Sequence, residues 1–258
     1  IIPGLVGSEM CIRDRCIIGL GLIGGSIGLA MKRSKISNQI IGFARSNSTL
    51  KRAIELGLVD KVKDNLEDAV NDCDLIILAT PLSTFKKLVE EMSPFLKKDC
   101  IITDTGSAKL SVIEDLRGIL PNNVEFIPGH PIAGTEESGP DAGFAELFDN
   151  RWCILTPTEE NSSNAIGLIK EFWESIGSKV EIMDPLHHDK VLAITSHIPH
   201  LIAFNIVGTA NNLANVTEKE VVKYSAGGFR DFTRIAASDP KMWSDIFTYN
   251  SEAVLEML

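Results

Sequence analysis

A glycine-rich turn between two apolar segments constrains the fold of this chain more than any other feature. Apolar residues 16–18 lead directly into Gly-Leu-Gly-Leu-Ile-Gly at 19–24, and apolar residues then recur at helical spacing as far as Met31. This order predicts a β-strand, a tight turn and an α-helix. In such a unit the glycines make the turn, admit a pyrophosphate and let the helix pack on the strand. We therefore expect a dinucleotide-binding turn with phosphates at a helix N-terminus.

Strand-like and helix-like segments alternate through the residues that follow. The run Leu-Ile-Ile-Leu-Ala-Thr at 75–80 is nearly all apolar, as a strand buried on both faces of a parallel sheet requires. The other predicted strands lie at 39–43, 100–104, 124–127, 153–156 and 180–183, with amphipathic helices between them. The sequence therefore predicts an α/β fold, a Rossmann-type doubly wound domain over residues 16–183.

The pattern changes after Asp184-Pro185, and residues 184–258 are predicted to form an all-helical second domain. Its segment 201–207 is apolar nearly all round, so we expect it to be buried inside the domain or against a second subunit. A capping box at 217–220 and the pair Asp239-Pro240 predict helix starts. By analogy of fold, such a domain makes a substrate cleft and a homodimer contact.

Both ends of the chain are unusual. Residues 1–15 have neither the apolar centre of a signal peptide nor a clean periodicity, so we expect a non-native or disordered lead-in outside the fold. At the other end, apolar residues at helical spacing continue to Met257 with no glycine or proline to close the helix. This predicts that the helical domain is truncated.

The composition excludes several classes of protein. The 258 residues are 44% hydrophobic and 23% charged, as in soluble globular proteins. No apolar run approaches the roughly 18 residues of a membrane span. The net charge of -10 argues against a nucleic-acid-binding surface. Five scattered cysteines without a Cys-x-x-Cys pair predict buried thiols in a reducing, cytoplasmic setting.

The end of the second predicted strand bears on the kind of dinucleotide. NAD-binding domains place a carboxylate there for the ribose 2′-hydroxyl, whereas this chain has Ala-Arg-Ser-Asn at 44–47. An arginine beside a hydroxyl suits a 2′-phosphate, so NADP is favoured; the alternative is a surface arginine and bound NAD. The predicted cofactor-binding residues are Gly19, Gly21, Leu22, Ile23, Gly24, Arg45, Ser46, Thr80 and Pro81.

Two further stretches follow strands at the edge where ligands of open α/β sheets bind. In the first, at 103–109, Ser107 and Lys109 can reach a ligand and Asp104 can be structural; ordinary loop and helix-cap chemistry is the alternative. The second, at 128–139, is an irregular loop rich in glycine and proline that holds His130 at the mouth of the sheet. We expect His130 to act as an acid or base, which requires its neutral form for the base role. The alternative is a hydrogen-bonded structural histidine.

Five motifs in order resemble the prephenate and arogenate dehydrogenases of tyrosine biosynthesis, and the likeness covers nearly the whole chain from Cys16 on. The motifs are the glycine turn at 19–26, the segment 103–109, Gly-His-Pro-Ile-Ala-Gly-Thr-Glu at 129–136, Thr-Ser-His-Ile-Pro-His at 195–200, and Gly-Phe-Arg-Asp-Phe-Thr-Arg-Ile-Ala at 228–236. The resemblance implies NAD(P)-dependent oxidative decarboxylation of a cyclohexadiene acid. The reaction is either prephenate to 4-hydroxyphenylpyruvate or arogenate to tyrosine.

The resemblance also implies roles for individual residues. His130, with help from Ser107, would bind the ring hydroxyl, and Glu136 would lie at the entrance of the site. His200 and Ser196 would lie at the side-chain end of the substrate. For His200 the alternative is a cap on carbonyls that a nearby proline frees from helical hydrogen bonds.

Two arginines complete the implied substrate site. Arg234, with Arg230 one helical turn away, would clamp a substrate carboxylate through charge-assisted hydrogen bonds. The alternative is that they pair with Asp231 at the surface. We expect no metal, because the cluster at 187–189 lacks a regular ligand spacing.

Two other functions remain open from the sequence. A β-hydroxyacid dehydrogenase or imine reductase shares the expected architecture but does not need the histidine loop. A non-catalytic NADP-binding sensor needs the glycine turn, but it does not need His130, Ser107 and Arg234 to converge on one cleft.

Overall fold

The computed structural model describes residues 14–212 and 227–258. Outside the described residues lie 1–13 of the expected lead-in, which include Cys11, and the capping box expected at 217–220. Asp14 and Arg15 belong to strand β1 (Asp14–Ile18), where they pair with Gln39 and Ile40. The expected boundary at residue 16 is therefore too late, because a strand that begins with charged residues gives no apolar signal there.

A six-stranded parallel sheet forms the centre of the N-terminal region. Its strand order is β3-β2-β1-β4-β5-β6. The bounds are β2 (Gln39–Phe43), β3 (Lys61–Lys63), β4 (Leu75–Leu78), β5 (Ile101–Asp104) and β6 (Glu125–Ile127). The order reverses between β1 and β4, as in a doubly wound sheet, which confirms the Rossmann-type prediction. Strand β3 was not predicted, because three residues with two lysines carry no apolar pattern.

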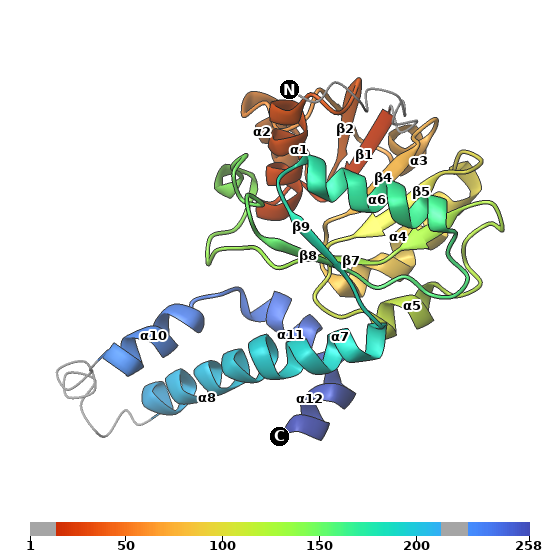
Figure 1. The fold of residues 1–258 in the computed structure, drawn as a ribbon. Helices are drawn as coiled ribbons and strands as arrows, with labels where there is room; N and C mark the ends of the chain where they lie inside the picture. Colours follow the sequence, from red (N-terminus) through yellow and green to blue (C-terminus); the bar gives the residue numbers. More distant parts are fainter. Residues whose placement is uncertain (1–13, 213–226) are drawn as a thin grey trace, which may run out of the picture.

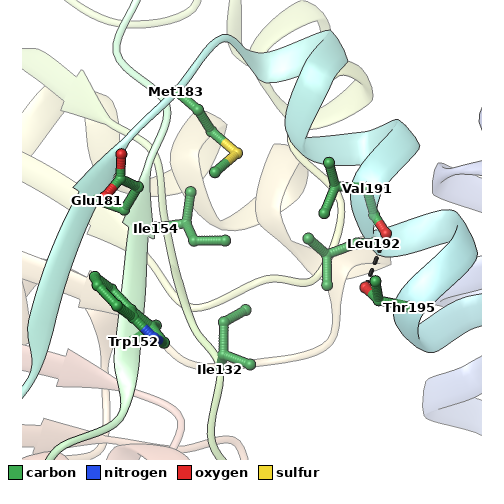
Figure 2. A pocket seen from close by; sticks show the side chains of 8 residues that line it. All are labelled: Ile132, Trp152, Ile154, Glu181, Met183, Val191, Leu192 and Thr195. Atoms are coloured by element: carbon green, nitrogen blue, oxygen red, sulfur yellow. Dashed lines mark hydrogen bonds between the residues drawn. The ribbon is translucent and has the colours of Figure 1, made fainter.

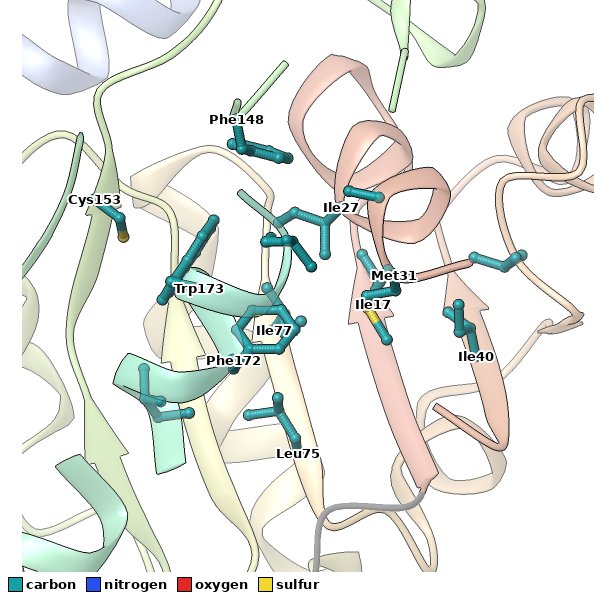
Figure 3. Close-up of a cluster of buried hydrophobic side chains, with 14 of the residues drawn as sticks. Ile17, Ile27, Met31, Ile40, Leu75, Ile77, Phe148, Cys153, Phe172 and Trp173 are labelled. Carbon is teal, nitrogen blue, oxygen red and sulfur yellow. The ribbon is translucent and has the colours of Figure 1, made fainter. Parts of the chain in front are cut away.

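Helices cover both faces of this sheet (Figure 1). Buried residues of α1 (Leu22–Ser34), α2 (Asn47–Glu55) and α6 (Ser163–Ser175) belong to one apolar cluster. Buried residues of α3 (Leu66–Val70), α4 (Phe85–Met92) and α5 (Leu110–Leu116) belong to a second. Figure 3 shows the first cluster, in which side chains of the sheet, α1 and α6 gather. The two clusters hold the carboxyl ends of the strands in place for the site.

Three more strands form a separate small sheet, β7-β8-β9. Strand β7 (Gly129–Pro131) runs antiparallel to β8 (Trp152–Leu155), which pairs in parallel with β9 (Lys179–Ile182). The expectation of an irregular loop around His130 is therefore wrong, since this residue lies in a strand. Glycine and proline are uncommon in strands, so the sequence pattern did not indicate this one. Proline is tolerated there because β7 is an edge strand.

The described residues after β9 are helical. Helix α7 (Pro185–Leu192) continues through a π-helical turn, η4 (Ala193–His197), into α8 (Ile198–Asn212). Three further helices are α10 (Gly227–Ile235), α11 (Pro240–Tyr249) and α12 (Ser251–Met257). Asp239 caps α11 by accepting hydrogen bonds from the Lys241 and Met242 N–H groups, as its position before Pro240 predicted.

Helices α8 and α10 lie side by side and project away from the sheets (Figure 1). By length and composition the helical run 185–210 could cross a membrane, and only 22% of its most apolar window is buried. Ala203 is buried, but Ile202 is 42% exposed. The apolar segment at 201–207 was expected to be buried either inside the domain or against a second subunit. The exposure of Ile202 shows that the segment is not buried inside the domain.

Candidate active site

The glycine turn connects β1 to α1 and is held by both neighbouring strands. Gly19 has a φ of +99°, and its N–H donates to the Phe43 carbonyl at 2.8 Å. A Cβ on Gly19 would collide with the Ala79 carbonyl oxygen, and a Cβ on Gly24 would collide with the Gly19 carbonyl oxygen. The turn therefore brings the ends of β1, β2 and β4 together at one edge.

Gly21 has a different role, because a Cβ built on it would meet nothing within 4 Å. Gly21 is also the N-cap residue of α1, where no side chain caps the helix and no acidic residue occupies the first turn. An open surface beside unpaired helical N–H groups is what a diphosphate requires. Leu22 is packed into the core and Ile23 is half-buried. The residues fit a dinucleotide.

The other predicted cofactor residues lie at the same edge. Arg45 is exposed just beyond β2, and Ser46 caps α2 by accepting a hydrogen bond from the Thr49 N–H at 3.3 Å. Thr80, just beyond β4, forms a hydroxyl–hydroxyl hydrogen bond with Thr84 at 2.7 Å, and Pro81 is exposed. Their convergence follows from the parallel register of β2, β1 and β4.

His130 lies in β7 and faces helix α7. Its Nδ1 is 2.9 Å from Nε2 of His188, and Nδ1 of His188 is 2.8 Å from Oδ1 of Asp189. The two rings meet edge to face with centroids 5.1 Å apart. His188 is fully buried, Asp189 is 2% exposed and His130 is 8% exposed. The three side chains form one buried polar chain.

The chain of hydrogen bonds determines where the protons lie. A carboxylate only accepts, so neutral His188 carries its proton on Nδ1 and presents a lone pair on Nε2. His130 must then donate from Nδ1, which leaves its own Nε2 without a proton. Neutral His130 is thus held as the tautomer that can accept a proton at Nε2.

Burial keeps both histidines neutral. It lowers the pKa of His130 well below its usual value, and the positive charge of the Lys109 ammonium lowers it further. Burial also lowers the pKa of His188, against the opposing effect of its hydrogen bond to Asp189. A neutral imidazole at the sheet edge is the form that a general base needs.

The segment 103–109 folds beneath His130. Ser107 lies in it half-buried, whereas the ammonium of Lys109 is fully buried 2.5 Å from Oδ2 of Asp104. The expectation that Lys109 reaches a ligand is therefore wrong for its side chain, because this ion pair holds it inside the protein. Asp104 is structural, as the sequence analysis expected, because it pairs with Lys109 and accepts the Gly129 N–H.

A second group of predicted residues lies where η4 and α8 meet α11. His200 stacks on Trp243 with centroids 3.6 Å apart, and its Nδ1 donates to the Ser196 carbonyl at 2.8 Å. Burial lowers the pKa of His200, and the nearby charge of Arg234 also lowers it. Arg230 and Arg234 are exposed on α10, and among the described residues no ion pair joins either to Asp231. The Ser196 bond matches the carbonyl-cap alternative for His200.

Glu136 lies exposed in the segment after β7. A separate cavity of about 320 Å³ opens between the small sheet and helix α7 (Figure 2). It contains none of the predicted site residues. Its lining residues are Ile132, Trp152, Ile154, Glu181, Met183, Val191, Leu192 and Thr195. Because these side chains are mostly apolar, we assign the chemistry to the His130 edge and not to this cavity.

Sequence reasoning missed the contribution of His188 and Asp189. It considered them only as metal ligands, and no metal-binding group of histidine, cysteine, aspartate and glutamate occurs within 14–212 and 227–258. His187 is exposed, and its N–H donates to the cap residue Asp184. The available signal was the Asp184-Pro185 helix start, which places residues 188 and 189 in the first turns of a helix.

A cofactor turn open at the start of α1 and a neutral, buried histidine beyond the sheet define a dinucleotide-dependent oxidoreductase. Comparison with known proteins gives its family. The model of the prephenate dehydrogenase nucleotide-binding domain matches residues 27–182, and that of the prephenate dehydrogenase dimerization domain matches 184–258. The chain belongs to the prephenate dehydrogenase family.

Individual relatives agree with this family. The chain is 45% identical over 242 residues to a cyclohexadienyl dehydrogenase of Zymomonas mobilis, covering 94% of this chain and 82% of the relative. A crystal structure of Aquifex aeolicus prephenate dehydrogenase with hydroxyphenyl propionate and NAD+ superposes with a TM-score of 0.87 at 38% identity. That match covers 95% of this chain and 85% of the other. These likenesses support an NAD(P)-binding dehydrogenase over the sensor.

The β-hydroxyacid dehydrogenase alternative is similar in fold alone. A 3-hydroxyisobutyrate dehydrogenase from Salmonella typhimurium has a TM-score of 0.66 at 12% identity, covering 95% of this chain and 88% of that chain. At this identity the shared architecture carries no information on the substrate.

Proposed function

We propose that this protein catalyses the NAD(P)-dependent oxidative decarboxylation of prephenate or arogenate. The observation that carries the proposal is the proton-accepting Nε2 of His130, set by the hydrogen bonds through His188 to Asp189. The family, the name of the Zymomonas mobilis relative and the hydroxyphenyl ligand of the Aquifex aeolicus structure support this substrate class.

The proposed mechanism assigns each step to a residue of the chain. NAD(P), held at the glycine turn, supplies the hydride acceptor when bound. Nε2 of His130 takes the proton of the ring hydroxyl while the carbinol C–H bond breaks and its electron pair leaves as hydride. The ring carboxylate is then lost as carbon dioxide, its electron pair aromatises the ring, and the ring oxygen takes the proton back from Nε2 of His130. A positioned base of this kind contributes roughly 10²- to 10⁴-fold in rate.

His188 and Asp189 stabilise the charge that this step creates. Once protonated at Nε2, His130 still donates from Nδ1 to His188, whose own Nδ1–H donates to the carboxylate of Asp189. Hydrogen bonds to charged groups contribute about 1.5–3 kcal/mol each, so the imidazolium is favoured where it forms.

The remaining site residues are proposed as substrate contacts. Ser107 would bind the ring hydroxyl beside His130, and Arg234 with Arg230 would hold a substrate carboxylate. His200 and Ser196 would meet the side-chain end, and Glu136 the entrance. The effect of Arg234 on the pKa of His200 supports their placement in one region.

We further propose NADP as the preferred cofactor. The described residues at the end of β2 offer exposed Arg45 and the hydroxyl of Ser46, with no carboxylate in the segment 44–47. Arg45→Ala should weaken NADP binding at least about tenfold and leave NAD binding nearly unchanged. The reason is that the guanidinium would contact only the 2′-phosphate, which NAD lacks. Equal effects on both dinucleotides in a calorimetric titration would contradict the preference.

We also propose a homodimer that joins through its helical domain at 184–258, with the nucleotide-binding domain beginning at β1 and covering 14–183. The apolar, largely unburied run 185–210 and the dimerization-domain match support this arrangement. The buried free thiols of Cys16, Cys73, Cys100 and Cys153 support a reducing, cytoplasmic location.

One experiment tests the reaction itself. Purified protein is mixed with prephenate or arogenate and with NAD+ or NADP+, and the absorbance of the reduced cofactor is followed in each combination. We expect turnover with at least one pair. Absence of reduced cofactor in all four combinations, for folded protein that binds dinucleotide, would overturn the proposal.

A further inference from the structure

Asp104 and Lys109 form an ion pair that is fully buried in the interior. Their side chains have no exposed surface, and the ammonium lies 2.5 Å from Oδ2 of Asp104. Burying two charges is unfavourable unless their remaining hydrogen-bonding capacity is also used. Here Oδ2 also accepts the Gly106 N–H at 2.8 Å.

The remaining bonds of the pair hold Gly129, the residue directly before His130. Oδ1 of Asp104 accepts the Gly129 N–H at 3.0 Å, and Nζ of Lys109 donates to the Gly129 carbonyl at 2.7 Å. Both backbone groups of Gly129 are therefore bound by opposite charges. On the other side, β7 pairs with β8, where His130 is opposite Ile154.

The same segment holds the far end of the histidine chain. The Lys109 and Leu110 N–H groups donate to the two carboxylate oxygens of Asp189, each at 2.9 Å. Asp189 in turn fixes His188, which fixes the ring of His130. One segment, 104–110, thus anchors both the backbone before His130 and the carboxylate at the end of its hydrogen-bond chain.

We propose that the Asp104–Lys109 ion pair is a positioning device that sets the place and orientation of the base His130. This inference rests on the proposed function. Neither residue contacts the reacting atoms in this account; both act through Gly129 and Asp189. Misplacing a base by a fraction of an ångström lowers the rate without removing the substrate site.

The charge of Lys109 supports the inference. Burial is the largest cause of the lowered pKa of His130. Three neighbouring groups lower the pKa of His130 further: His188 of α7, Lys109 of the segment after β5 and His197 of η4. Removing the ammonium should therefore let His130 gain a proton more easily. A pair that served only to stabilise the fold would leave kcat unchanged in a folded variant that lacks it.

The test replaces both charges at once. Lys109→Met alone leaves a buried carboxylate without its partner and can prevent folding. The double variant Asp104→Asn/Lys109→Met removes both charges and is the main probe. The matched control is Lys87→Met/Glu91→Gln, an exposed pair on α4 with N···O at 3.7 Å.

For the double variant we expect kcat to fall about 10- to 100-fold with the Michaelis constants nearly unchanged. The acid limb of its pH–rate profile should move to higher pH. Nitrogen NMR of the histidines, recorded without substrate, should show the same upward movement for His130. The control variant should match the wild type in all three measurements.

The two proposals fail in different ways. Absence of turnover by the wild-type protein with every substrate and cofactor pair contradicts the proposed function, while the NMR titration still tests the positioning. A folded double variant with wild-type kcat and an unchanged His130 titration overturns the positioning inference.

Discussion

At the scale of single residues, the proposed chemistry depends on which nitrogen of His130 carries the proton. That choice is made at Asp189, whose carboxylate receives the His188 Nδ1–H and the N–H groups of Lys109 and Leu110. A carboxylate cannot donate, so the direction of every hydrogen bond back to His130 is fixed.

Asp189→Asn should therefore impair catalysis without removing the site. A carboxamide can donate to Nδ1 of His188, which reverses the tautomers and leaves His130 protonated at Nε2. We expect kcat to fall about 10²- to 10⁴-fold. The matched control is Asp184→Asn at the N-cap of the same helix, because asparagine caps as well as aspartate. Equal kcat for both variants in steady-state assays would refute the tautomer argument.

The pH dependence follows from the lowered pKa of His130. An unperturbed histidine base would give an activity that rises through about pH 6.5, its usual pKa. Burial lowers the pKa of His130, so its neutral form persists to lower pH. The acid limb of kcat/KM should therefore lie below about 6.5. A limb at or above that value would show that His130 is not the buried neutral base.

The sequence singled out His130 as a candidate because its flanking glycine and prolines mark a restrained position after a core strand. It could not find His188 as the partner, since 58 residues separate the two and only the packing of α7 against β7 brings them together. It also assigned Lys109 to ligand contact, because the burial of an ion pair depends on the tertiary fold.

At the scale of elements, Gly24 and Gly21 have different roles in the turn between β1 and α1. Gly24 is required for packing, whereas Gly21 borders open space. The apolar strands β2, β4 and β5 were readable from sequence because they are buried on both faces. Strands β3 and β7 were not, because lysine, glycine and proline conceal three-residue strands.

The pair Gly21→Ala and Gly24→Ala tests this division. Gly21→Ala should keep the wild-type melting temperature but weaken dinucleotide binding at least about tenfold, since the new methyl group enters the phosphate space. Gly24→Ala should lower the free energy of unfolding by about 1–3 kcal/mol through overpacking against Gly19. Thermal melting and calorimetric titration distinguish the two. Wild-type dinucleotide affinity in Gly21→Ala would place the phosphates elsewhere.

At the scale of the whole molecule, the two parts of the chain leave different kinds of surface. The six-stranded sheet is covered by helices on both faces, whereas apolar side chains are exposed on η4 and α8, namely Ile194 at 57% and Ile202 at 42%. The all-round apolar pattern at 201–207 predicted a covered helix, but sequence alone could not say whether the cover is internal or a second copy.

If a second copy of the chain covers α8, a charged substitution on α8 should disrupt the dimer. Ile202→Glu should place a charge in the proposed dimer contact and shift the protein to monomers in sedimentation velocity. Ile54→Glu, at an isoleucine of α2 that is 44% exposed, is the control and should remain dimeric. If the wild-type protein is itself monomeric, or if Ile202→Glu still dimerises, the contact is not at α8.

We propose His130 as the base of a dinucleotide-dependent dehydrogenation, and the His130→Asn variant is the decisive test. Its kcat with the better of prephenate and arogenate is measured beside its dissociation constant for the preferred cofactor. We expect turnover at least about a hundredfold lower, with cofactor affinity nearly unchanged. Wild-type turnover, or a loss of cofactor binding that explains the lost activity, would contradict it.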